Sequence, residues 1–185
     1  LFSKIIKQGS TVYDIGANVG FYTLLASVLV GPRGKVFAFE PAPRNIYYLK
    51  EHLRLNRCDN VTVIEAAVSD KDDIAFFEEC ITSSFDHLST KGNLKVKTIS
   101  LDNLVAKGKV PPPDYIKIDV EGAELLVLFG AKKILVNCSP TTFLSTHGFD
   151  LYSQCSTFLK SINYDLQSVN GDINNVYELL AFKRR

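Results

Sequence analysis

Two acidic residues stand where a nucleoside-containing ligand would need them. The segment TVYDIGANVG places Asp14 ahead of Gly16 and Gly20, and the segment KVFAFE ends on Glu40. Glycines in such a turn let the backbone bend sharply and approach a ligand closely. An acid after the second strand of a strand-helix-strand unit accepts hydrogen bonds from both hydroxyls of a ribose. The alternatives are structural: a tight turn, and a glutamate that meets helix N-terminal amides.

The charges around the glycines indicate which nucleoside ligand fits. A phosphate-binding loop requires a lysine after its glycines, and a dinucleotide fold requires glycine where this chain has Asn18. Asp14 would repel phosphate groups. S-adenosylmethionine has a ribose and no phosphate, and an acid suits its sulfonium and ammonium groups. The turn therefore favours this cofactor.

A second group of polar residues lies in IKIDVEGAE. Lys117 and Asp119 point to one face of the same expected strand. A lysine among apolar residues needs a carboxylate partner, and Asp14 is the candidate. Asp14 is therefore expected either to contact the cofactor or to form a scaffold ion pair with Lys117, and the two roles are compatible.

If the methyl group of this cofactor is transferred to a hydroxyl, a base must remove the proton of that hydroxyl. The candidates for this base are Asp119, Glu121 and His147. Asp119 lies at the carboxyl end of the strand expected at 114–118, His147 lies just past the one expected at 141–145, and His147 is the first choice. Glu124 is expected to cap the N-terminus of a helix. No second histidine lies near His147, so we expect no metal site.

Alternating strand and helix patterns position these residues. Runs rich in β-branched and aromatic residues predict strands at 11–15, 35–39, 61–68, 114–118 and 141–145. Apolar residues at helical spacing predict helices at about 21–29, 43–53, 125–129 and 151–162. Strands that are apolar on both faces are typical of a parallel sheet covered by helices.

Two regions depart from this alternation. Residues 72–104, which include LKVKTISLDNL, predict short extended segments around a polar TSS loop, and we expect an inserted antiparallel piece. Residues 164–169 and 176–182 predict an antiparallel hairpin at the end of the sheet. The length of 185 residues favours one domain over residues 1–185.

Composition excludes several classes of protein. The net charge of +1 argues against a protein that grips phosphate backbones, so nucleic acid is an unlikely partner. No apolar run is long enough for a membrane span, and the opening residues lack the apolar region of a signal peptide. The cysteines show no metal-ligand spacing and are interpreted as reduced thiols. A cytoplasmic protein is the resulting expectation, and the oligomeric state is left open.

Five ordered blocks resemble the FkbM family of S-adenosylmethionine-dependent methyltransferases. They are VYDIGANVGFYTLLAS, KVFAFEPAPRNIYYLKEHLRLN, VTVIEAAVSD, SLDNL and DYIKIDVEGAELLVLFGA. The resemblance covers residues 11 to about 147. It implies a Rossmann-like, doubly wound sheet of seven mostly parallel strands, with helices on both faces and a C-terminal antiparallel hairpin.

The resemblance also implies a set of cofactor-binding residues: Asp14, Gly16, Ala17, Asn18, Gly20, Glu40, Pro41, Ala67 and Asp70. It implies O-methylation of a hydroxyl on a small molecule, sugar or glycan. The alternatives are an RNA methyltransferase, a nicotinamide-dependent oxidoreductase and a non-catalytic nucleotide-binding module. A base-directed enzyme usually has an Asp/Asn-Pro-Pro-aromatic element after the fourth strand, where this chain has DVEG.

Overall fold

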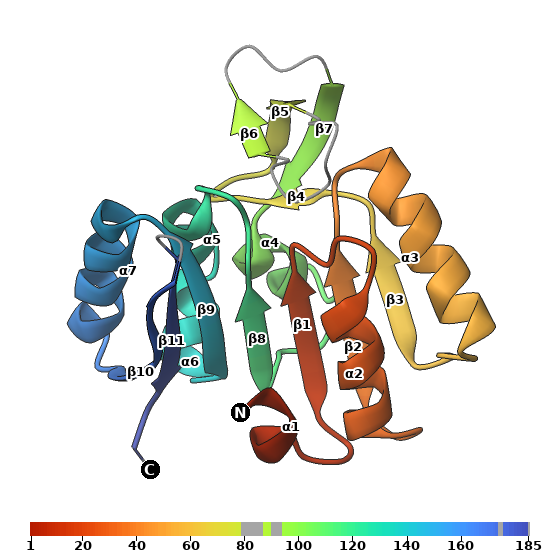
Figure 1. Ribbon diagram of the computed structural model, residues 1–185, viewed down its shortest axis with the longest axis horizontal. Coiled ribbons are helices and arrows are strands. Elements are labelled where there is room, and N and C mark those ends of the chain that lie inside the picture. The colour runs from red at the N-terminus through yellow and green to blue at the C-terminus, as the bar shows by residue number, and fades with distance from the viewer. Residues whose placement is uncertain (79–86, 90–93, 174–175, 185) are drawn as a thin grey trace.

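The computed structural model describes residues 1–78, 87–89, 94–173 and 176–184. Its centre is a seven-stranded sheet in the order β10-β11-β9-β8-β1-β2-β3 (Figure 1). The five strands from β9 to β3 run parallel, and β11 lies antiparallel between β9 and β10. The mostly parallel sheet and the C-terminal antiparallel hairpin are therefore confirmed. Their bounds are β1 (Thr11–Ile15), β2 (Lys35–Phe39), β3 (Val61–Ile64), β8 (Tyr115–Ile118), β9 (Thr141–His147), β10 (Asp165–Ile173) and β11 (Val176–Phe182).

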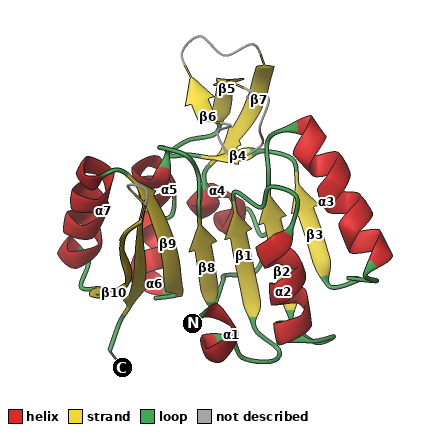
Figure 2. Ribbon diagram, in the orientation of Figure 1, coloured by secondary structure: helices red, strands yellow, loops and turns green. Residues whose placement is uncertain are grey.

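Helices cover both faces of this sheet, with α2 in front of it and α4 and α6 behind it in the view of Figure 2. Helices were expected near 21–29, 43–53, 125–129 and 151–162, and a helix forms at each place. The short helices α1, α4 and α6 were not expected. The bounds are α1 (Phe2–Ile5), α2 (Phe21–Val30), α3 (Pro43–Leu55), α4 (Leu101–Ala106), α5 (Glu124–Gly130), α6 (Lys132–Asn137) and α7 (Phe149–Ser161).

The core lies on both faces of the central strands because successive side chains of a strand point to opposite faces. Tyr13 and Ile15 of β1 belong to the larger apolar cluster, which also contains residues of α5 and α6. Val12 belongs to a second cluster with α1 and α2. Asp14 shares the face of Val12, so its carboxylate points to the side of the sheet that α2 covers. The polar residues of the site are thus set into a buried layer.

The prediction of one strand over residues 61–68 is wrong in its second half. It ends at Ile64, where the Ala66 N–H donates to the Ile64 carbonyl at 2.9 Å and the chain turns. Glu65 at the turn is exposed and pairs with Lys50 of α3. The next residues form β4 (Ala67–Val68), which pairs with β7 (Leu94–Ile99) instead of continuing the large sheet. A charged residue in an apolar run marks this break.

A second, four-stranded sheet lies beyond the carboxyl ends of the parallel strands (Figure 1), in the order β4-β7-β5-β6. It consists of β4, β5 (Asp73–Glu78), β6 (His87–Ser89) and β7 (Leu94–Ile99), and β5 pairs antiparallel with β6 and β7. The TSS loop lies outside the described residues. The extended structure expected for SLDNL is wrong, because Ser100 accepts the Asn103 N–H at 3.5 Å and begins α4.

None of the helices in the described ranges has both the length and the apolar character needed to cross a membrane.

Candidate active site at the carboxyl edge of the parallel sheet

The glycine turn between β1 and α2 depends on left-handed backbone angles. The φ angles of Gly16, Asn18 and Gly20 are 76°, 51° and 101°. A Cβ atom on Gly16 would lie 1.9 Å from the carbonyl oxygen of Asp119, so only glycine lets the turn pack against the residue that follows β8. The Gly16 N–H donates to the Phe39 carbonyl at 3.1 Å. The turn is therefore fixed against both neighbouring strands.

Glu40 holds the same turn from the end of β2, and its side chain is 4% exposed. Its Oε2 accepts the Asn18 N–H at 2.9 Å, and its Oε1 accepts the Ala42 N–H at 3.0 Å and the Asn45 amide at 3.3 Å. Ala17 is buried beside it in the turn. Glu40 thus orders the glycine turn and the start of α3. Its contact with a ribose stays a prediction.

Asp14 and Lys117 form the expected scaffold ion pair. The two residues are opposite each other in the β1–β8 register, and Lys117 Nζ lies 3.4 Å from Asp14 Oδ1 and 3.4 Å from Asp119 Oδ2. Lys117 also donates to the Gly16 carbonyl at 3.2 Å, and Asp14 Oδ2 accepts the Thr23 hydroxyl at 2.6 Å. Burial lowers the pKa of Lys117, but the two carboxylates outweigh it and raise the pKa above its ordinary value. Direct contact of Asp14 with a cofactor stays a prediction.

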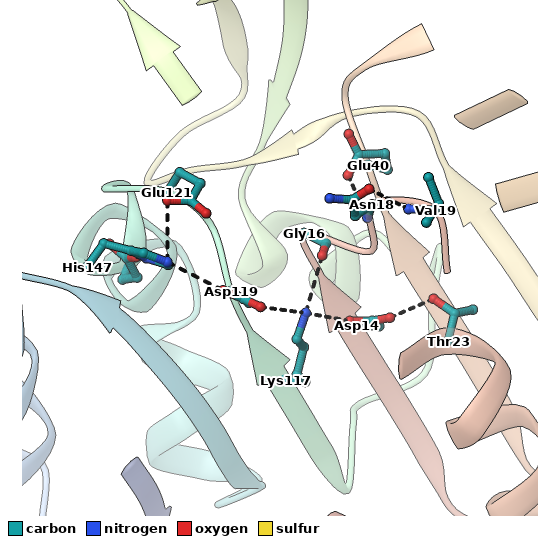
Figure 3. A network of polar contacts seen from close by, with 11 residues as sticks. Asp14, Gly16, Asn18, Val19, Thr23, Glu40, Lys117, Asp119, Glu121 and His147 are labelled. Carbon is teal, nitrogen blue, oxygen red and sulfur yellow. Dashed lines mark hydrogen bonds and ion pairs between the residues drawn. The ribbon is translucent and has the colours of Figure 1, made fainter. Parts of the chain in front are cut away.

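His147 at the end of β9 is surrounded by three carboxylates, of which Figure 3 shows those of Glu121 and Asp119. Its Nδ1 lies 2.6 Å from Glu124 Oε1, and its Nε2 lies 3.3 Å from Glu121 Oε2 and 3.8 Å from Asp119 Oδ1. The three candidates for a base are therefore brought together. Since Asp119 also faces Lys117, the ion pairs continue from His147 to Asp14 beneath the glycine turn.

The carboxylates raise the pKa of His147. The hydrogen bond to Glu124 is the largest cause, burial opposes it, and the charges of Glu121, Glu124 and Asp119 add to it. We expect the ring to titrate above its ordinary value of 6.5, and Glu124→Gln to lower this pKa. A raised pKa stabilises the fold fully below the unfolded-state pKa, and the contribution is lost as the pH rises through the folded-state pKa. NMR titration of the imidazole ring measures this pKa in the wild type and in the Glu124 variant.

The control for this titration is Glu121→Gln, which removes a charge that acts on His147 without the hydrogen bond of Glu124. It should lower the pKa of His147 by less than Glu124→Gln does. An equal or larger shift in the Glu121 variant would show that the bond to Glu124 is not the dominant cause.

The remaining expected cofactor residues lie near this edge with different surroundings. Pro41 lines a cavity of about 380 Å³ between α3 and β7. Ala67 is buried in a small cluster with Ala42 and Val96, which places it near the residues that follow Glu40. Asp70 is exposed, and its carboxylate accepts the Ser69 hydroxyl at 3.1 Å. Ala67 is thus brought to the site, whereas no contact of the described structure joins Asp70 to it.

Three residues hold the site although their sequence context does not identify them as site residues. Thr23 donates to Asp14, His52 Nδ1 lies 2.7 Å from the Val19 carbonyl of the turn, and Glu124 binds His147 as well as the Gly122 N–H at 3.3 Å. Thr23 and His52 look like ordinary residues of α2 and α3. Glu124 carries one signal, an acid within an otherwise apolar helix start, which was interpreted as capping alone. Among the described residues, no group of His, Cys, Asp and Glu side chains is arranged to hold a metal ion.

The fold is that of the Rossmann-like methyltransferases. The crystal structure of an FkbM methyltransferase from Methylobacillus flagellatus superposes with a TM-score of 0.73 at 18% identity, over 94% of this chain and 43% of that one. The family of the methyltransferase FkbM domain matches residues 14–175. This chain therefore belongs to the FkbM methyltransferase family, as the ordered sequence blocks predict.

The names of two curated relatives state what they methylate: a hexuronic acid in one case and a 2-O position in the other. The chain is 35% identical to the hexuronic acid methyltransferase AglP of Haloferax volcanii, over 70% of this chain and 53% of that protein. It is 26% identical to the 2-O-methyltransferase NoeI of Sinorhizobium fredii, over 81% of this chain and 68% of that protein. The chain thus spans about half the length of the first relative and about two thirds of the second.

Proposed function

We propose that this chain uses S-adenosylmethionine to methylate a hydroxyl group of a sugar or glycan. The observation that carries the proposal is the placement of two sites on one sheet edge. The glycine turn with Glu40 lies at the ends of β1 and β2, and the His147 cluster lies at the ends of β8 and β9. An open parallel sheet binds its ligands outside the carboxyl ends of its strands, at the point where the strand order reverses. The two named relatives support a hydroxyl on a sugar as the acceptor.

The residues at the glycine turn fit this cofactor. The carboxylates of Glu40, Asp14 and Asp119 lie at or beneath the turn, and Lys117, the cation among them, is already paired. Such a set suits a ribose, a sulfonium and an ammonium group and disfavours a pyrophosphate. Glu40 would hold the ribose, and Gly16, Ala17, Asn18 and Gly20 would surround the methionine part. When bound, the cofactor supplies an electrophilic methyl group on a positively charged sulfur.

His147 is the proposed base for the acceptor hydroxyl. In the neutral ring, Nδ1–H donates to Glu124 and the lone pair is on Nε2, which faces Glu121 and Asp119. The acceptor oxygen would take the methyl group as its bond to sulfur breaks, with S-adenosylhomocysteine as the leaving group. The hydroxyl proton would pass to Nε2 of His147, and the carboxylates around the ring would stabilise the imidazolium. Because the pKa of His147 is raised, turnover should increase with pH above 6.5 until the ring is neutral.

Isothermal titration calorimetry with S-adenosylhomocysteine tests the proposal. The wild-type chain should bind this product and not NAD. Glu40→Ala should weaken binding by about 1 to 3 kcal/mol, the scale of hydrogen bonds lost from a charged group. The matched control is Glu51→Ala, since Glu51 is an acidic residue of α3 that pairs with Arg54 on the surface. It should leave the affinity unchanged.

The alternatives give different results in the same measurement. If the chain binds NAD but not S-adenosylhomocysteine, the oxidoreductase is favoured. If it binds neither ligand, both proposed enzyme activities are contradicted. An RNA methyltransferase would transfer a labelled methyl group to RNA and not to sugars. The net charge of +1 argues against that alternative.

A further inference from the structure

Three aromatic side chains lie together at the end of β9 that carries His147. Phe149 is the first residue of α7, Tyr152 lies one turn further along the helix, and Tyr177 comes from β11. The ring centroids are 6.1 Å apart for Phe149 and Tyr152, 6.2 Å for Phe149 and Tyr177, and 4.9 Å for Tyr152 and Tyr177. These three residues are called the aromatic platform below.

The backbone around His147 fixes the position of the platform. Tyr177 is opposite Thr146 in the β9–β11 register, and the Thr146 hydroxyl donates to the Tyr177 carbonyl at 3.1 Å. Gly148, with φ 104°, turns the chain from His147 into α7 and so presents Phe149. Both sides of the platform are therefore tied to neighbours of His147.

The aromatic platform is exposed to solvent at Phe149, as a binding surface is and as the apolar core of a protein is not. The side chain of Phe149 is 62% exposed, while Tyr152 and Tyr177 are partly buried beneath and beside it. A single exposed apolar residue needs no explanation. Here the exposed ring is held by two others, at the edge that carries the candidate base. A supported aromatic face beside polar groups is the usual composition of a small-molecule site.

The charges that continue from His147 to Asp14 restrict which acceptor can approach His147. The ion-pair network contains four carboxylates, those of Asp14, Asp119, Glu121 and Glu124, and two cations, Lys117 and protonated His147. A further negative charge beside His147 would be repelled. Carboxylates only accept hydrogen bonds, so they favour a ligand that brings several hydroxyl donors. A neutral sugar ring meets both conditions, because it combines an apolar C–H face with a rim of hydroxyls.

We propose that the aromatic platform binds a neutral pyranose ring of the acceptor, with its C–H face against Phe149 and one hydroxyl directed to Nε2 of His147. The negative face of an aromatic ring attracts the slightly positive hydrogens of such a C–H face. This inference rests on the proposed function and adds to it the acceptor surface and a preference for neutral sugars over hexuronates.

The test measures methyl transfer from S-adenosylmethionine to the methyl glycosides of common neutral pyranoses and to the matching methyl hexuronides. The wild type should use a neutral glycoside with a higher kcat/KM than its hexuronide. Phe149→Ala should raise the KM for the sugar about tenfold or more and change kcat less than about twofold, the pattern of lost acceptor binding. Phe149→Tyr keeps the aromatic face, so its KM should stay within about threefold of the wild type.

The matched control is Phe129→Ala, which removes an aromatic ring that is 45% exposed and packs on Phe158. It should leave KM and kcat at wild-type values, and calorimetry should give the same affinity for S-adenosylhomocysteine in all of these variants. Thermal unfolding checks that Phe149→Ala is folded, as the exposure of the residue leads us to expect.

Failure of the inference and failure of the proposed function look different. If the wild type methylates sugars but Phe149→Ala has an unchanged KM, the platform is overturned and the proposed function stands. A preference for hexuronides overturns the neutral-sugar part in the same way. If the wild type methylates none of the sugars, or does not bind S-adenosylhomocysteine, the proposed function fails and the platform inference fails with it.

Discussion

Gly16→Ala should lower the free energy of unfolding by about 2 to 5 kcal/mol, the combined scale of a left-handed non-glycine residue and of overpacking. The φ angle of Gly16 is 76°, and the added methyl group would lie 1.9 Å from the Asp119 carbonyl oxygen. That oxygen belongs to backbone, which side-chain rotation cannot move away. Relief requires β1 and β8 to separate, and the Lys117 contacts between them would then be lost. Urea unfolding followed by circular dichroism measures the effect.

Gly108→Ala is the matched control for this prediction. Gly108 also has a left-handed φ angle, 65°, but nothing lies within 4 Å of the position of its Cβ atom. Its substitution should therefore show the backbone part alone, about 1 kcal/mol. The difference between the two variants isolates the collision with Asp119. Equal losses in both variants would show that the strands adjust to the methyl group without strain.

The positions of the parallel strands could be predicted because each run of β-favouring residues is flanked by turn residues and alternates with a helical pattern. The run at 61–68 shows where this reasoning fails. Its apolar residues continue past Glu65, but the chain turns there and Ala67 pairs with β7, a strand that lies far along the chain. The charge of Glu65 marks the break, but no local signal identifies the distant strand with which Ala67 pairs. The helix at 101–106 differs, since it has a local signal in its Ser100 cap, but the extended pattern of the preceding residues leads directly into it.

The residues of the candidate site also fall into a group that could be predicted from the sequence and a group that could not. Asp14, Glu40, Asp119 and His147 could be placed because each stands at or near the carboxyl end of a strand, and parallel strands bring these ends to one edge. Residues that act from helices could not be placed. Glu124 faces His147 only because α5 packs beside β9, and sequence spacing does not encode this contact.

Lys117→Met should destabilise the fold by about 3 to 5 kcal/mol, the scale for removing one partner of a buried ion pair. Asp14 is completely buried, and the side chain of Lys117 is 8% exposed. Without the lysine, Asp14 keeps the Thr23 hydroxyl as a hydrogen-bond donor, but its charge has no compensating cation among the described contacts. Methionine replaces the lysine with an apolar side chain of similar length, so the change is mainly in charge. Denaturant unfolding at neutral pH gives the loss.

The double variant Asp14→Asn/Lys117→Met separates charge from packing. If the uncompensated carboxylate causes the loss, removing its charge should restore much of the stability, because replacing both partners of a buried pair is often close to neutral. Lys107→Met, which breaks the exposed pair with Asp72, should change stability by only about 0 to 1 kcal/mol. A double variant less stable than Lys117→Met would instead assign the loss to packing around Tyr22, whose ring centroid lies 4.9 Å from Nζ. Recovery in the double variant would make Asp14 and Lys117 a charge pair that supports the glycine turn from below.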